Sequence, residues 1–382
     1  MFVVAAAILF IGALDCPQTV VAARLAAARH QLQAKRYDHA AAMLDKLRSC
    51  NSLSPLESFQ MGWLYGRARH FAEALRILKS VPGDVPDRAS HEYAIALSSF
   101  ELADYRSTVE TLETLAKEES LNEESANLLG VSYSKLGLCG EAESTLIQEI
   151  QHNRGDLPAY LNLVTLYADQ GRFGEAEKTA SEAVEAFPKS SEVFVVRGAA
   201  NTLIGQLDKA YVDFSSAASL APHKADPRFF LALTRYKQGK FVDAINSLES
   251  AKRLGIADSD LHYLLAECLL RVNGANTQAA MAELDRAIEM NTNSVSARAL
   301  RGKLLLEAGR TKEAAADLER ALRQDPNSRS SAYNLARAYR KLERTDESRL
   351  LFEQLRNQQP DSLGELSRRR LNQVLTRKES QP

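Results

Sequence analysis

The sequence predicts an all-α protein built as an array of similar helical hairpins, and three observations support this prediction. The chain of 382 residues is longer than one hydrophobic core usually serves, so it must form several domains or an array along one axis. Its composition is rich in the helix-favouring residues Ala, Leu, Glu and Arg and poor in Val, Ile and Thr. The third observation is a strict internal period of 34 residues, which indicates an array.

Small or short residues mark this period. The pattern is a small residue followed by an apolar residue after four positions and by another small or apolar residue after seven. It recurs at steps of 34 residues, except for one step of 36 where RVNGANTQ inserts two residues in a predicted turn. The ten anchor residues are Ala40, Ala74, Thr108, Ala142, Ala176, Ala210, Ala244, Ala280, Ala314 and Ser348. Each anchor is predicted to lie in the second helix of a hairpin.

A second set of small or short residues lies twelve positions before each anchor, or fourteen in the unit with the insertion. The set is Ala28, Gly62, Ala96, Gly130, Val164, Gly198, Ala232, Ala266, Gly302 and Ala336. Small residues at a helix crossing allow the two backbones to approach to the short end of the usual range of about 8–10 Å. We therefore expect a bulky replacement, such as Leu at Ala176, to spread its hairpin.

The chain is expected to contain three segments: residues 1–17, residues 18–360 and residues 361–382. The first includes the uncharged run MFVVAAAILFIGAL, which has the length of the apolar region of a secretory signal. We therefore expect an exported protein, periplasmic or membrane-associated. No Lys or Arg precedes the run, so the alternative is that it forms the first helix of a cytoplasmic protein. The second segment holds about ten repeats, and the third is expected to form a capping helix and a polar tail.

The four cysteines are too scattered for a disulfide framework, and none belongs to a CxxC pair that would suggest a metal site. Cys16 and Cys50 flank the first hairpin and could form a disulfide in an exported chain. Cys139 and Cys268 are expected to be small buried hydrophobic residues.

Three segments carry a resemblance to a known family: LYADQGRFGEAEKTASEAVEAFP, GAANTLIGQLDKAYVDFSSAASLAP and GKLLLEAGRTKEAAADLERALRQDP. Each ends on a proline, Pro188, Pro222 or Pro326, that stops the second helix. The pattern closely resembles the tetratricopeptide repeat and covers residues 20–360. The resemblance implies a right-handed α-solenoid of about ten hairpins whose first helices line a concave groove for proteins or peptides. It implies a scaffold and does not imply catalysis.

No motif indicates catalysis or cofactor binding. The sequence lacks GxSxG, HExxH, P-loop and GxGxxG motifs, and its seven histidines share no spacing. We therefore expect no catalytic residue, cofactor, metal or small-molecule substrate, and we expect the histidines to be solvated or to cap helices. The net charge is −7 from Glu101 to Arg154 and +7 from Ala297 to Pro382. The two regions should attract different partners. Because the middle of the chain is acidic and the excess of basic residues is confined to one end, we do not expect the protein to bind nucleic acid.

The candidate binding residues are aromatic and basic side chains expected to face the groove. The aromatic set is Phe59, Trp63, Tyr93, Phe100, Phe229, Tyr236, Tyr263 and Tyr333. Exposed aromatic residues at a concave site usually anchor a partner, and the alternative is that these rings pack between helices. The basic set, Lys303, Arg337, Arg340 and Lys341, suits an acidic segment or an anionic surface, with a solvated helix face as the alternative.

Together, these observations predict a non-catalytic adaptor that holds a protein or peptide partner in its groove, outside the cytoplasm. The alternative function is that of an accessory subunit in an envelope polysaccharide, secretion or glycosyltransferase system whose catalysis lies on another chain. An enzyme in its own right would need a catalytic set that the sequence does not contain.

Overall fold

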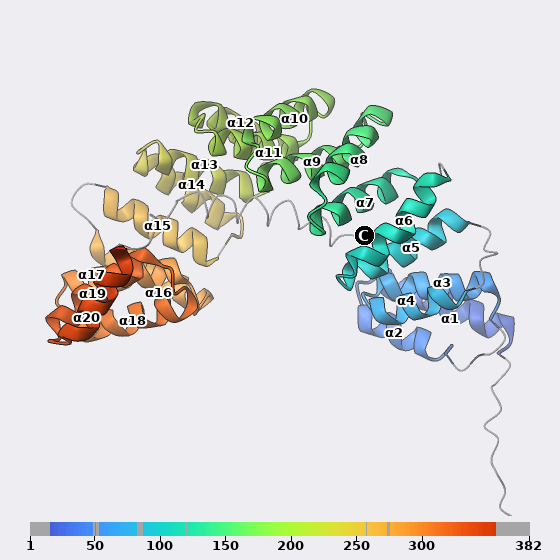
Figure 1. Cartoon of the computed structure of the whole chain (residues 1–382), viewed down its shortest axis with the longest axis horizontal. Helices are drawn as coiled ribbons and strands as arrows, with labels where there is room; N and C mark the ends of the chain where they lie inside the picture. Colours follow the sequence, from blue (N-terminus) through green and yellow to red (C-terminus); the bar gives the residue numbers. More distant parts are fainter. Residues whose placement is uncertain are drawn as a thin grey trace, which may run out of the picture. The chain divides into compact units, whose positions relative to one another are not determined.

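The computed structural model describes residues 16–356, except residues 49, 51–52, 82–86, 119–120, 257 and 273–275. The described part contains twenty α-helices in ten consecutive pairs (Figure 1), which confirms the predicted all-α architecture. The predicted capping helix at residues 361–382 and most of the apolar segment at residues 1–17 lie outside the described residues.

The first helices of the hairpins are the odd-numbered ones: α1 (Gln18–Gln33), α3 (Pro55–Arg67), α5 (Arg88–Glu101), α7 (Glu123–Lys135), α9 (Leu157–Asp169), α11 (Ser191–Leu203), α13 (Asp226–Lys237), α15 (Ser259–Arg271), α17 (Val295–Glu307) and α19 (Arg329–Lys341). The second helices are α2 (Tyr37–Asp45), α4 (Phe71–Ser80), α6 (Tyr105–Lys117), α8 (Cys139–His152), α10 (Phe173–Ala186), α12 (Leu207–Leu220), α14 (Phe241–Arg253), α16 (Thr277–Met290), α18 (Thr311–Gln324) and α20 (Thr345–Arg356).

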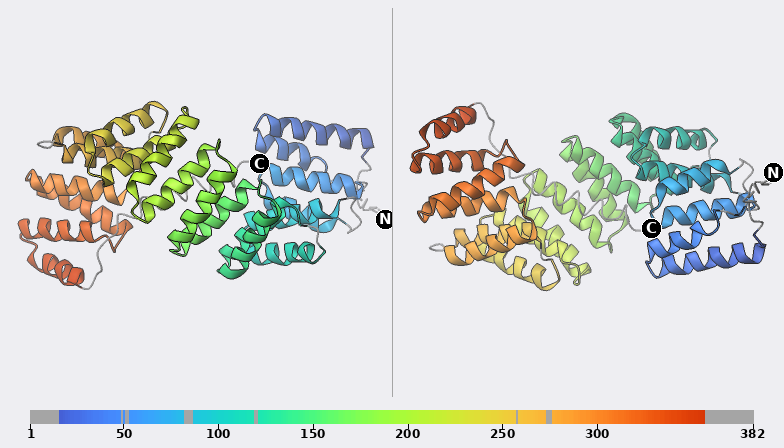
Figure 2. Two further views of the ribbon diagram at one scale, coloured as in Figure 1. Left: turned by 90° about the horizontal axis from the view of Figure 1, so that it is seen from above. Right: turned by 90° about the horizontal axis from the view of Figure 1, so that it is seen from below.

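The helices form two compact units. Unit 1 ends at Leu166, inside α9, and unit 2 begins at Tyr167. In unit 1, each odd-numbered helix from α1 to α7 packs against the even-numbered helix that follows it, and each hairpin contacts the next. The same pattern holds in unit 2 from α11 to α20, and Figure 2 shows the hairpins stacked in sequence within each unit.

Contacts between hairpins identify the helices that form a continuous surface. In unit 1, α1, α3, α5 and α7 contact one another in succession, and in unit 2 the same is true of α11, α13, α15, α17 and α19. Within the described part of each unit, successive even-numbered helices contact one another at most weakly. The side of each unit formed by first helices is therefore the more tightly packed side, as expected for the inner side of a curved array.

The small residues predicted at the helix crossings are buried as expected. Ala176 has no exposed surface, and all ten anchors are buried. A Cβ atom added to Gly62 would lie only 2.7 Å from Leu78, and one added to Gly198 would lie 2.8 Å from Phe214. A large side chain of the second helix therefore fills the space that glycine leaves on the first helix, which explains why these positions stay small.

Two anchors carry a hydroxyl group in place of the alanine. The Thr108 hydroxyl donates a hydrogen bond to the carbonyl oxygen of Ala96 at 3.2 Å, and the Ser348 hydroxyl donates to that of Ala336 at 2.7 Å. Both acceptors belong to the first helix of the same hairpin. The buried hydroxyls are therefore satisfied where the two helices cross, so these substitutions keep the hairpin intact.

Helix ends and the N-terminal region also agree with the sequence pattern. The helices α10, α12 and α18 end two residues before Pro188, Pro222 and Pro326, as predicted. A disulfide joins Cys16, ahead of α1, to Cys50, beyond α2, with their Cα atoms 5.4 Å apart. The disulfide therefore joins the chain just before α1 to the chain just after α2, opposite the turn of the first hairpin. Of the helices in the described ranges, none has both the length and the apolar character that a membrane span requires.

Candidate functional site

The structure divides the eight predicted aromatic residues into three groups. Trp63 and Tyr333 are exposed, with 39% and 51% of their surface accessible. The residues Phe59, Tyr93, Phe100, Tyr236 and Tyr263 are partly buried. Phe229 is fully buried, so its assignment to the groove was wrong. Its ring packs edge-on against Phe230 at 6.1 Å and belongs to the apolar core between α13, α14 and α15.

The partly buried rings mostly contact neighbouring helices and turns. Phe59 packs edge-on against His91 at 5.7 Å, and Phe100 packs against Tyr105 at 5.3 Å. Both contacts join different helices, so these rings contribute to packing as well as to the first-helix surface. The structure thus supports the alternative interpretation for part of the aromatic set, namely that the rings pack between helices.

Two of the predicted residues meet at a carboxylate that the sequence analysis missed. The Tyr236 hydroxyl donates a hydrogen bond to Glu267 Oε2 at 3.2 Å, and the Tyr263 hydroxyl donates to Glu267 Oε1 at 3.3 Å. Burial, together with this carboxylate, raises the pKa of Tyr236 to about 12 and also raises the pKa of Tyr263. Glu267 occupies the same place in its repeat as Trp63, Lys303 and Arg337, and this shared repeat position is the signal that could have found it.

Trp63 lies near the middle of α3, whose start is well defined. The Ser54 side chain accepts a hydrogen bond from the Glu57 backbone, Glu57 bonds back to the Ser54 backbone, and Pro55 opens the helix. The guanidinium carbon of Arg67, one turn after Trp63, lies 4.9 Å from the indole ring centre. This cation–π contact holds the arginine over one face of an exposed ring.

The predicted basic residues lie on α17 and α19, two first helices that contact each other. The guanidinium carbon of Arg337 lies 5.8 Å from the ring centre of Tyr333, which repeats the arrangement of Trp63 and Arg67. Lys341 Nζ donates a hydrogen bond to the Leu306 carbonyl oxygen at 3.4 Å and so links the last two hairpins. Lys303 Nζ lies 4.0 Å from Glu307 Oε1, so this carboxylate partly offsets the positive charge that a partner would meet. Arg340 is exposed.

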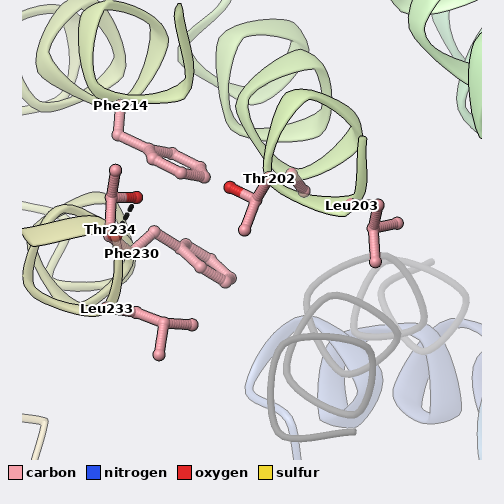
Figure 3. Close-up of a pocket in the computed structure, with 7 residues that line it drawn as sticks. Thr202, Leu203, Phe214, Phe230, Leu233 and Thr234 are labelled. Atoms are coloured by element: carbon pink, nitrogen blue, oxygen red, sulfur yellow. Dashed lines mark hydrogen bonds between the residues drawn. The ribbon is translucent and has the colours of Figure 1, made fainter. Parts of the chain in front are cut away.

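A small cavity in unit 2 cannot hold a ligand. It lies between α11, α12 and α13, has a volume of about 10 Å³ and is lined by Thr202, Phe214, Phe230 and their neighbours (Figure 3). The rings of Phe214 and Phe230 stack at 5.1 Å, and the Thr234 hydroxyl is already bonded to the Phe230 carbonyl oxygen. A space of this size holds at most one water molecule, so it is a packing gap.

The buried charges of unit 2 are paired. His262 Nδ1 lies 2.5 Å from Glu283 Oε2, and Arg298 Nη1 lies 2.8 Å from Asp317 Oδ1. His262 and His91 are both buried, which corrects the expectation that the histidines are solvated, although His91 does bond the Leu78 carbonyl oxygen near the end of α4. Such pairs are typical of structural contacts between helices. Within the described ranges, no group of three or more His, Cys, Asp or Glu residues could hold a metal ion.

The fold and the first-helix surfaces define a helical-repeat protein, and comparisons with known families specify which kind. The family model for the C-terminal domain of cilia and flagella-associated protein 70, a tetratricopeptide-repeat domain, matches residues 88–339. A tetratricopeptide-repeat model matches residues 330–362. The chain therefore belongs to the tetratricopeptide-repeat family, as the sequence pattern predicted.

Two curated relatives are similar over parts of their length. Anaphase-promoting complex subunit 7 of Arabidopsis thaliana is 28% identical over 159 residues, which cover 41% of this chain and 28% of the relative. BBSome complex member BBS4 of Bos taurus is 23% identical over 266 residues, which cover 60% of this chain and 51% of the relative. The chain thus spans about a quarter to a half of the length of these relatives.

Solved structures support the fold. A tetratricopeptide-repeat protein from Parabacteroides merdae has a TM-score of 0.53 at 18% identity, covering 65% of this chain and 98% of that one. The APC/C hetero-tetramer Cut9-Hcn1 has a TM-score of 0.52 at 13% identity, covering 92% of this chain and 84% of that one. Identities this low bear on the fold alone.

Proposed function

We propose that this chain is a non-catalytic scaffold that binds segments of partner proteins on the surfaces of its first helices. The observation that carries the proposal is the exposure of Trp63 and Tyr333. Among the odd-numbered helices in the described part of the chain, these two aromatic residues alone are exposed, and each lies one turn before an arginine that contacts its ring. Exposed aromatic and arginine side chains are the residues that most often dominate binding energy at interfaces. The names of the two curated relatives, which describe members of multi-protein complexes, fit this proposal.

The C-terminal surface favours an acidic segment or an anionic surface as its partner. Arg337 and Arg340 lie on the same helix as Tyr333, and Lys303 and Lys341 lie nearby along the α17–α19 pair. A guanidinium group can bind a carboxylate through two parallel hydrogen bonds, and the neighbouring ring provides apolar contact. If charge reversal of Arg337 and Arg340 leaves every interaction unchanged, an acidic partner is excluded at this surface.

The proposed location is outside the cytoplasm, in the periplasm or at a membrane. The support is the disulfide between Cys16 and Cys50, because such bonds persist in oxidising compartments and are rare in the cytosol. The apolar run near the start of the sequence is consistent with export. An exported scaffold also leaves open the alternative function, an accessory subunit of an envelope polysaccharide, secretion or glycosyltransferase system. Copurification of an enzyme with the chain would favour that alternative.

An affinity experiment with the full chain tests the proposal. The wild type, Trp63→Ala, Tyr333→Ala and a control variant, Tyr37→Ala, are used to capture proteins from the native envelope fraction, followed by mass spectrometry. Tyr37 is a suitable control because it is an exposed tyrosine on a second helix. We expect specific proteins to be lost with Trp63→Ala or Tyr333→Ala and kept with Tyr37→Ala. The same set retained by all four forms would contradict binding on the first-helix surfaces.

A further inference from the structure

One repeat position forms a row along the first helices of unit 1. Arg29, Trp63, Leu97 and Val131 lie 34 residues apart, on α1, α3, α5 and α7, which contact one another in succession. Arg29 and Trp63 are exposed, and Leu97 and Val131 are partly buried. The row therefore begins with a cation and continues as apolar surface. At the same position in unit 2, Ala199 and Leu233 are buried, and the last three hairpins carry Glu267, Lys303 and Arg337, so a partly exposed apolar row is particular to unit 1.

Gly66 interrupts a second row beside the first. It follows Trp63 by three residues on α3 and therefore lies on the same side of the helix. The equivalent residues on the neighbouring helices are large and apolar, namely Leu32 on α1 and Phe100 on α5. This second row therefore has a gap at Gly66, where α3 carries no side chain, on the same side of the helix as the exposed indole ring. We call Trp63, Gly66, Arg67 and Arg29 the Gly66 site.

Neither folding nor packing explains the glycine. A Cβ atom added there would lie 3.8 Å from Ala74 Cβ and 3.9 Å from Ser98 Oγ, which are ordinary contact distances. This differs from Gly62, four residues earlier, where the added atom would lie 2.7 Å from Leu78. The left-handed residue of the following turn is Arg69, so the turn does not require glycine at position 66 either. Glycine inside a helix lowers stability relative to alanine, and a glycine without a structural reason suggests close approach by another molecule.

The charges around the gap specify the partner further. Arg29 and Arg67 are exposed, and neither lies within ion-pair distance of a carboxylate in the described part of the chain. Arg67 is held over the Trp63 ring by the contact described above. Two cations beside an apolar gap complement a segment in which one bulky apolar side chain has acidic neighbours.

We propose that the Gly66 site binds a peptide segment of a partner protein, with one bulky apolar side chain placed over Gly66 against Trp63 and acidic residues paired with Arg67 and Arg29. This inference rests on the proposed scaffold function and assigns the chemistry of the ligand to one place on unit 1. The inference can be tested by changing one position, because a side chain introduced at Gly66 would occupy the gap directly.

The test uses the full chain and a displayed library of random peptides. Peptides selected on the wild type are synthesised and titrated, and the emission of Trp63 is recorded. Trp63 is the one tryptophan in the sequence, so its emission reports on the Gly66 site alone. The variants are Gly66→Met, which fills the gap, and Gly66→Ala, which adds one methyl group at ordinary contact distance. The matched control is Gly140→Met on α8, where an added Cβ would meet no atom within 4 Å.

We expect the selected peptides to share a bulky apolar residue with acidic neighbours and to shift the Trp63 emission. Gly66→Met should weaken their binding roughly tenfold or more, which is the effect of losing one good anchor pocket, and Gly140→Met should not. Gly66→Ala should retain the fold and weaken binding less. Arg67→Glu should weaken binding to acidic peptides.

Two results would overturn the inference, and only the second would also count against the proposed scaffold function. Peptides that bind without changing the Trp63 emission, and that bind Gly66→Met as well as the wild type, would exclude the Gly66 site while leaving the scaffold function intact. Selection of no peptide at all would count against both the Gly66 site and binding of peptide segments by this chain.

Discussion

At the scale of single residues, each hairpin turn that the structure describes in full, which leaves out the turn between α15 and α16, contains one residue with a left-handed backbone. It recurs every 34 residues, and glycine occupies it at Gly137, Gly171, Gly205 and Gly239. Lys35, Arg69, Ala103 and Glu343 adopt the same conformation without being glycine, with φ from 57° to 64°. A residue with a Cβ atom pays about 1–2 kcal/mol in this conformation, so these four turns are strained.

Replacing Ala103 by glycine should therefore stabilise unit 1. We expect the free energy of unfolding to rise by about 1 kcal/mol, because relief of the strain exceeds the additional freedom of glycine in the unfolded chain. Urea unfolding monitored by Trp63 emission measures the change within unit 1. The reverse substitution at an equivalent turn, Gly137→Ala, serves as the control and should destabilise the unit. An unchanged midpoint for Ala103→Gly would show that the turn is not strained.

The sequence predicted the burial of a residue correctly where the repeat itself requires a small residue at that position. It failed where burial depends on side chains from other helices. Ala176 and its equivalents were predictable because a small residue recurs wherever two helices cross. Phe229 was not, because its burial depends on Phe230 and on the core between α13 and α15, which a local pattern does not contain. Glu267 was missed because no carboxylate occupies its position in neighbouring repeats.

At the scale of helices, a tyrosine at one repeat position links a first helix to the second helix of the preceding hairpin, and it does so in three of the repeats. The hydroxyl of Tyr65 donates to Asp45 at 2.8 Å, that of Tyr133 to Glu113 at 2.8 Å, and that of Tyr339 to Glu319 at 2.9 Å. In each case the acceptor lies 20 residues earlier. Burial, assisted by the carboxylate, raises the pKa of Tyr339 to about 12, so the hydroxyl remains a donor at physiological pH.

Tyr133→Phe should remove one of these links while keeping the ring. We expect a loss of about 1 kcal/mol in the free energy of unfolding, the usual net contribution of a partly buried hydrogen bond. Thermal or urea unfolding of unit 1 provides the measurement. Tyr105→Phe is the matched control, because its ring packs against Phe100 and its hydroxyl makes no hydrogen bond with the residues that the structure describes. Equal losses for both variants would mean that the hydrogen bond contributes nothing specific.

The junction of α7, α8 and α9 contains two buried carboxyl groups, Glu149 and Asp156. Desolvation raises the pKa of both groups; Asp156 raises that of Glu149 further, and a bond from Asn127 to Asp156 opposes the shift there. One Glu149 oxygen has no hydrogen-bond partner. Because the folded-state pKa lies above the unfolded value, the folded state binds the proton more tightly. The stability contribution of these groups therefore grows as pH falls through the folded pKa and is complete below the unfolded value.

Glu149→Gln should accordingly stabilise unit 1 more at neutral pH than in acid. We expect a rise in melting temperature at neutral pH that shrinks as the pH falls and the wild-type carboxyl group takes up its proton. Glu141→Gln, an exposed position on the same helix, is the control for loss of one charge. A gain that is independent of pH, or a loss at neutral pH, would show that the carboxylate is favourably solvated.

At the scale of the whole molecule, the period predicted the ten hairpins but not the division into two units. The 34-residue step continues through α9, so the sequence contains no change in pattern at Leu166 and Tyr167. Local periodicity specifies how one hairpin packs on the next, and it does not specify where one compact unit ends and the other begins. For the same reason, the sequence identified a surface formed by first helices and could not say which rings on it remain exposed.

The ends of such an array are its least supported parts, and the disulfide addresses this at the N-terminal end. Among the described residues, the first hairpin, α1 and α2, packs mainly on α3, whereas the internal hairpins of each unit pack on hairpins on both sides. Cys50→Ser should therefore destabilise this hairpin by about 2–4 kcal/mol, the usual effect of a disulfide that closes a loop of this length. Hydrogen exchange of the full chain should become faster in α1 and α2 and stay unchanged in unit 2, because the repeats of such an array open nearly independently. Cys139→Ser, which removes a free cysteine on α8, is the control. Unchanged exchange in α1 and α2 would mean that the apolar core around Leu25 and Leu44 holds the hairpin without the covalent link.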